Sequence, residues 1–275
     1  MRLFLIFTSL LFVKISFSQE NKAKEILTKM LTASDNMKGA KYTLYKHERD
    51  KDKIEDSEII VKLTVSPFKI YVYSVNPNVG AEVLFIKREN NGDALVNPNK
   101  FPYINLNMNP YNSLLRGNDH HTILDMGFSY ITSVLKNYMA TYKDDFYKLL
   151  YYEGEEEFDG KKFYKLRIEN NKFAYTTYIV QNGENSTSIA KKLSVSEYMI
   201  SALNSDEIKA GQKIKIPNSY AKKIILLIDE INFLPLVQAV YDDKGLFEKY
   251  DHKSFILNPK FDPEEFTPKY KDYKF

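Results

Sequence analysis

Residues 178–217 read YIVQNGENSTSIAKKLSVSEYMISALNSDEIKAGQKIKIP, and this stretch predicts a small unit of its own. Residues 178–180 form a short strand that leads into a polar turn at Gly183. Two helices are expected over 189–193 and 198–203, because apolar residues recur there at helical spacing. A second strand follows over 213–216. The order strand, helix, helix, strand within forty residues predicts a compact βααβ module.

The pattern of this module resembles that of the LysM family. The residues that carry the resemblance are Tyr178, Val180, Gly183, Ile189, Ala190, Leu203, Asn204, Gly211, Gln212, Ile214, Ile216 and Pro217. The resemblance implies a domain that binds the N-acetylglucosamine backbone of peptidoglycan or chitin. It implies no cofactor.

A LysM module holds glycan in a shallow groove between the loop after its first strand and the loop before its second. The residues of this chain at those positions are Gly183, Glu184, Asn185, Ser186, Asn204, Ser205 and Asp206. The first loop usually reads Gly-Asp-Thr-Leu, so Ser186 stands where the family has an apolar residue, and the second loop is shorter than usual. Two roles stay open for the module, namely glycan binding and packing or protein contact.

The first eighteen residues read as a signal peptide that is cleaved after Ser18. Arg2 supplies a positive end, an apolar run covers 3–13, and Ser16 and Ser18 form a small-residue cleavage site. An uncleaved anchor is the alternative, but the run is shorter than the roughly 20 residues that span a bilayer. We expect an exported, periplasmic protein with no integral membrane span.

Composition narrows the function classes further. The chain has no cysteine, which excludes disulfides, Cys-zinc sites and a lipoprotein anchor. Loss of Arg2 and Lys14 with the leader lowers the formal charge from +3 to +1, so a nucleic-acid partner is not expected. No hydrolase motif is present, and we expect a protein that is not an enzyme.

His120 and His121 are the one pair that could suggest a metal, together with Asp119 and Asp125. Adjacent histidines on a helix point about 100° apart, so both rarely reach one ion. The sequence therefore predicts a helix start capped by Asn118 or Asp119, and no metal site.

The rest of the chain predicts an α+β fold built on one large sheet. Strand patterns cover 41–49, 58–65, 67–75, 81–87, 94–97, 146–152, 163–168, 173–180, 223–229, 236–241 and 247–250. A helix is expected at 21–38, and 98–120 reads as irregular. A second helix over 123–139 carries the apolar residues Leu124, Phe128, Ile131, Leu135 and Met139. About ten antiparallel strands curl, which predicts a half-barrel with both helices on its concave side and an apolar ligand cavity under residues 124–139.

The tail of the chain resembles the LolA and LolB type of periplasmic lipoprotein carriers. The residues concerned are Leu234-Pro235-Leu236, Tyr241-Asp242-Asp243-Lys244-Gly245 and Leu257-Asn258-Pro259-Lys260-Phe261. The N-terminal half looks more like a related bacterial family described as a domain of unknown function, at 66–69, 95–99 and 120–122. We expect residues 19–176 and 219–275 to form the carrier-like half-barrel, and 177–218 to be a LysM-like insertion between host strands 173–177 and 222–229.

Three functions follow in order of preference. The first is a periplasmic binding protein that holds a lipid or acyl chain in the half-barrel and contacts peptidoglycan through the LysM-like module. The second is an interaction protein with a filled core that docks another envelope protein. The third is a cell-wall hydrolase.

Overall fold

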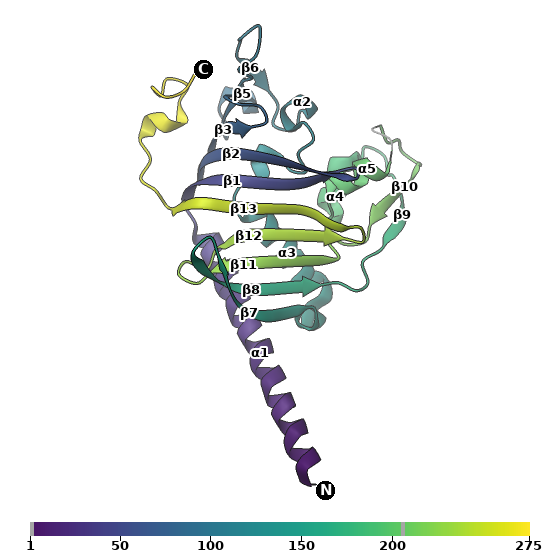
Figure 1. The fold of residues 1–275 in the computed structure, drawn as a ribbon. Helices are drawn as coiled ribbons and strands as arrows, with labels where there is room; N and C mark the ends of the chain where they lie inside the picture. Colours follow the sequence, from purple (N-terminus) through teal and green to yellow (C-terminus); the bar gives the residue numbers. More distant parts are fainter. Residues whose placement is uncertain (1–2, 205–206) are drawn as a thin grey trace.

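The computed structural model describes residues 3–204 and 207–275, with side chains from residue 19 onward. An eleven-stranded antiparallel sheet dominates it, in the order β6-β5-β4-β3-β2-β1-β13-β12-β11-β8-β7 (Figure 1). A separate two-stranded sheet pairs β9 with β10. The sheet is curled and open, so the predicted α+β half-barrel class is confirmed.

The sheet strands run as follows: β1 Gly39–Asp50, β2 Lys53–Val65, β3 Phe68–Asn76, β4 Glu82–Ile86, β5 Ala94–Asn97, β6 Leu106–Met108, β7 Leu150–Phe158, β8 Lys161–Glu169, β11 Lys223–Asp229, β12 Pro235–Asp242 and β13 Gly245–Leu257. Most neighbours are joined by short turns. Two pairings are long-range: β8 pairs with β11 across the intervening module, and β1 pairs with β13 from the other end of the chain. The β1–β13 pairing brings the first and last thirds of the chain together at the centre of the sheet.

Two helices cover one face of the sheet, as expected. α1 (Leu3–Asn36) lies against β7 and β8, and α3 (Ser129–Tyr142) lies beside it (Figure 1). Ile26, Leu27 and Met30 of α1 are buried in the same cluster as Leu135 of α3. Apolar burial between helices and sheet therefore stabilises this half of the fold. None of the helices in the described part of the chain has the length and apolar character needed to cross a membrane.

The helix predicted over 123–139 is broken at its start. Residues Ile123–Asp125 form a short 3-10 turn (η2), and the α-helix begins at Ser129. Gly127 lies between them with a φ of +89°, a left-handed conformation that a helix does not contain. The prediction missed this because the apolar period continues across the glycine.

Two other local predictions were wrong. Residues 98–120 are not wholly irregular, since they contain β6 and a short helix, α2 (Ser113–Arg116). The strand predicted from 146 begins later, because Lys143–Lys148 form a 3-10 turn (η3) that buries Phe146. The aromatic run at 146–152 looks like a strand, but packing under α1 and α3 decides its conformation.

The βααβ module consists of β9 (Tyr175–Ile179), α4 (Ser186–Leu193), α5 (Glu197–Leu203) and β10 (Lys213–Pro217). It has its own small core around Val180, Ile189 and Ile200. The predicted host strand 173–177 is wrong, because β9 pairs with β10 and not with the large sheet. The strands on either side of the module are β8 and β11, which pair with each other.

Candidate functional site

Two glutamates face each other across the central strand pair of the sheet. Glu48 of β1 is the direct cross-strand partner of Glu248 of β13. Both residues lie on the side of the sheet that carries the helices, and their exposed fractions are 6% and 1%. Like charges opposite each other destabilise a strand pair, so this arrangement needs compensation from nearby groups.

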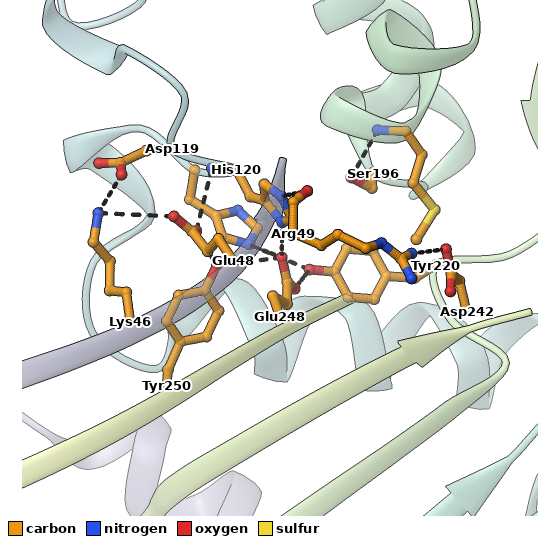
Figure 2. Close-up of polar contacts among 12 residues, drawn as sticks. Lys46, Glu48, Arg49, Asp119, His120, Ser196, Tyr220, Asp242, Glu248 and Tyr250 are labelled. Atoms are coloured by element: carbon orange, nitrogen blue, oxygen red, sulfur yellow. Dashed lines mark hydrogen bonds and ion pairs between the residues drawn. The ribbon is translucent and has the colours of Figure 1, made fainter. Parts of the chain in front are cut away.

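Tyrosines and a histidine provide part of that compensation. Tyr250, two residues along β13, donates its hydroxyl to Glu48 and also to Glu248 at 3.2 Å. Tyr220, in the segment before β11, donates to the other oxygen of Glu248. His120 lies against both carboxylates (Figure 2). We call Glu48, His120, Tyr220, Glu248 and Tyr250 the central cluster.

His120 is held on all sides by the fold. Its Nδ1 lies 2.8 Å from Glu248, its Nε2 lies 3.1 Å from the carbonyl oxygen of Arg49, and its backbone N–H donates to Glu48 at 3.2 Å. Its ring stacks on Tyr198 of α5 and on Phe247 of β13, with centroids 4.1 and 4.2 Å away. The side chain is therefore fixed by contacts from three separate elements.

Charged neighbours surround the cluster. Lys46 lies 3.9 Å from Glu48 and 2.5 Å from Asp119, while Arg49 pairs with Asp242 (Figure 2). Burial disfavours the charged form of His121, but the Glu248 carboxylate 3.3 Å away raises the pKa of His121 to about 9. Burial also disfavours the charged form of Glu248 and so raises the pKa of its carboxyl. The two histidines outweigh burial and hold that pKa well below its usual range.

The tyrosines stay protonated. Burial, followed by the charge of Glu248, raises the pKa of both Tyr220 and Tyr250 well above the usual value. Both hydroxyls therefore keep their protons and act as hydrogen-bond donors in the cluster.

Three hollows surround this cluster. A cavity of about 40 Å³ lies under α3 and is lined by Glu48, Glu248 and Ile131 among others. A cleft of about 410 Å³ lies between α3 and the module and is lined by His120, His121 and Arg116. A third, of about 670 Å³, lies on the other side of the module beside α5. Small-molecule pockets usually measure roughly 300–1,000 Å³, so the two clefts and not the cavity have ligand size.

The predicted apolar cover residues lie in packed core. Phe128, Ile131 and Leu135 are buried, and Leu124 and Met139 are partly buried against the two core clusters. Of these five, Ile131 lines the cavity of about 40 Å³. The structure thus brings Ile131 to the central cluster, and places the other four in apolar contacts between helix and sheet.

The predicted glycan loops are built around internal hydrogen bonds. Glu184 accepts from the Tyr178 hydroxyl, the Gln181 backbone and Lys192, and Gly183 adopts a φ of +78°. Asn185 caps α4, and Ser186 is its first residue. Asn204 bonds to Ile200 and, through both its oxygen and its nitrogen, to the backbone of Lys215. Ser205 and Asp206 lie outside the described residues.

The interpretation of His120 and His121 as a capped helix start was wrong. Thr122 caps the 3-10 turn with Asp125 as its partner, and His120 is in the loop before it. The two glutamates of the cluster were missed, because they lie 72 and 128 residues from His120. The alternation of buried and exposed residues in β1 could have indicated Glu48, since Lys46 and Glu48 lie on the same buried side of the strand as Leu44.

The family comparisons divide the chain into two regions. The model described as "Protein of unknown function (DUF1571)" matches residues 37–180, and the LysM domain model matches residues 178–217. The chain therefore contains a LysM domain, which confirms the resemblance read from that stretch. No curated protein matches the sequence.

Several solved structures are similar to this chain at low identity. MucB aligns with a TM-score of 0.47 and 10% identity over 90% of this chain, which spans 62% of MucB. Lipoprotein LppX of Mycobacterium tuberculosis aligns with a TM-score of 0.42 and 10% identity over 88% of this chain and 98% of LppX. LolA superfamily protein NE2245 of Nitrosomonas europaea aligns with a TM-score of 0.34 and 12% identity, over 89% of this chain and 97% of NE2245.

Proposed function

The chain belongs to the DUF1571 family and carries a LysM domain, and we propose that it is an exported, non-enzymatic envelope protein that binds the glycan of peptidoglycan. The half-barrel would serve as the body to which this binding domain is fixed. The leader-like first eighteen residues support export to the periplasm.

One observation carries the proposal, namely how the LysM domain sits on its host. On its α4–α5 side, Ser194 bonds to Asn137 at 2.7 Å and Glu197 bonds to Arg116 at 2.8 Å. From β9, Tyr175 bonds to Asp243 at 3.2 Å. Tyr198 bonds to Asp50 at 2.6 Å. The turn at 181–183 is exposed instead. This docking supports a glycan role, because the domain is held firmly while the first predicted glycan loop remains open to solvent.

The internal hydrogen bonds of the loops fit this role. Glu184 and Asn204 hold the loops in one shape, so little conformational entropy is lost when a ligand binds. Their side chains act as supports, and the exposed Gln181 and Asn182 and the loop backbone would make the contacts to sugar.

Sedimentation with purified peptidoglycan tests the proposal. The wild type should pellet with the wall material, and Asn182→Glu should reduce retention at least ~10-fold by placing a bulky negative charge at the loop. Asn105→Glu, at an exposed asparagine of the host, is the matched control and should pellet like the wild type. Equal retention of both variants, or no retention of the wild type, would remove the glycan role.

For the half-barrel, docking of another envelope protein is the second candidate. The concave side is filled by aromatic and aliphatic side chains, and the cavity there measures about 40 Å³. Carriage of a lipid or acyl chain would require α3 to move away from the sheet, with Gly127 as the break in the chain that permits it. Organic extraction and mass spectrometry of the purified protein test this: a co-purified acyl species would favour carriage, and its absence would favour docking.

A further inference from the structure

We propose that the central cluster is a binding site for one divalent transition-metal ion, with Glu48, His120 and Glu248 as its protein ligands. One ligand atom from each residue lies within 4.8 Å of those of the other two. Ligand atoms bonded to one zinc ion at about 2.0–2.2 Å lie roughly 3.3 Å apart, which falls inside the observed range.

The orientation of His120 is the first argument. Its Nε2 faces the Arg49 carbonyl oxygen at 3.1 Å, and a carbonyl can only accept, so Nε2 carries a hydrogen. Its Nδ1 faces a carboxylate oxygen of Glu248 at 2.8 Å, so the second ring nitrogen is directed at the carboxylate pair. A histidine whose second nitrogen donates to a backbone carbonyl is the usual arrangement around a bound metal.

Charge balance is the second argument. Glu48, Glu248 and Asp119 bring three negative charges, and Lys46 returns one positive charge. Arg49 is paired with Asp242 and adds nothing to the balance. The carboxylates of this site outnumber its lysine, and a bound cation would lower the electrostatic cost of burying them. Burying unpaired carboxylates is costly, so the compensation matters for folding as well as for binding.

The surroundings provide the remaining features of a metal site. Tyr250 and Tyr220 donate to the carboxylates and orient them, as outer-sphere groups do at metal centres. The cleft of about 410 Å³ between α3 and the LysM domain reaches His120, which offers an access path for the ion. One imidazole with two carboxylates favours a transition ion such as Zn²⁺ or Mn²⁺ over Ca²⁺, which prefers six to eight oxygens.

The test is metal binding by the purified chain. Protein stripped with a chelator is titrated with Zn²⁺, Mn²⁺ or Ca²⁺ in a calorimeter, and elemental analysis follows removal of free ion. The wild type should bind about one equivalent of Zn²⁺ or Mn²⁺, and saturation at about 100 Kd should raise Tm by about 5–10 °C. Ca²⁺ should give no comparable shift.

Variants locate the ion. Glu248→Gln keeps the shape but removes a ligand charge and should weaken Zn²⁺ binding at least ~10-fold. Glu82→Gln is the control, because Glu82 is equally buried and bonded to a tyrosine, Tyr71, but lies outside the cluster. If Glu248→Gln does not fold, the titration of the wild type still decides whether the protein binds a metal ion. The proposal would be overturned if the wild type binds no ion, in which case a proton on His120 is the cation of the cluster. It would also be overturned if Glu248→Gln binds Zn²⁺ as tightly as the wild type.

Discussion

Acid should destabilise this protein through His252, a buried histidine of β13. The ring packs against Tyr42 and Phe128, with centroids 4.9 Å away in both cases, and its Nδ1 donates to the Leu236 carbonyl at 3.0 Å. Burial lowers the pKa of His252 from 6.5 to about 4, although the Leu236 carbonyl and the nearby Asp251 oppose this shift. The folded state therefore keeps the imidazole neutral where the unfolded state takes up a proton.

The sign and size of this pH effect on stability follow from the difference between the folded and unfolded pKa values of His252. Because the folded pKa is the lower one, full stability is present above about pH 6.5 and is lost as the pH falls toward the folded value. One pKa unit corresponds to about 1.4 kcal/mol, so the loss from this residue is about 2 kcal/mol by about pH 5 and about 3 kcal/mol by about pH 4. This is a large part of the stability of an ordinary domain.

The assay is urea unfolding, followed by circular dichroism, of the wild type and of His252→Phe from about pH 7.5 to about pH 4. The variant loses the Leu236 hydrogen bond, which costs about 1 kcal/mol at every pH, but it cannot titrate. The stability advantage of the wild type should therefore shrink by about 3 kcal/mol on acidification, while other titrating groups cancel in the difference. A difference that stays constant with pH would refute the neutral, buried imidazole.

Two further predictions concern the LysM domain. Tyr198→Ala removes the bond to Asp50 and the ring stacked on His120, so the domain should become sensitive to proteases at both connections to the host, with a loss of about 2 kcal/mol or more in the free energy of unfolding. Tyr111→Ala, at an exposed tyrosine, is the control, and identical digestion of both variants would contradict rigid docking. Asn204→Ala removes two hydrogen bonds to the backbone of Lys215 in β10 and one to Ile200 in α5, and it should speed amide exchange in β10 at least ~10-fold, whereas Asn182→Ala should not. Unchanged amide exchange in β10 would show that the side chain of Asn204 does not stabilise this strand.

The LysM domain was readable from the sequence because its contacts are local. Its core residues Val180, Ile189 and Ile214 lie within forty residues, and their spacing reports the strand and helix periods directly. The sheet was predictable for a similar reason, since each strand carries its own alternation. Gly127 shows the limit of this reasoning: the apolar period crosses it, yet its backbone conformation ends the helix.

The candidate metal cluster depended on contacts that no local pattern contains. Glu48 and Glu248 become neighbours through the pairing of β1 with β13, and His120 reaches them from a loop that has no regular period. A sheet can in principle pair its strands in many orders, and the alternation within each strand does not say which strands become neighbours. The chain thus encodes its elements and its LysM domain in short-range periodicity. The strand order created the buried site, because only tertiary packing brings two carboxylates and a histidine from distant segments into one place shielded from water.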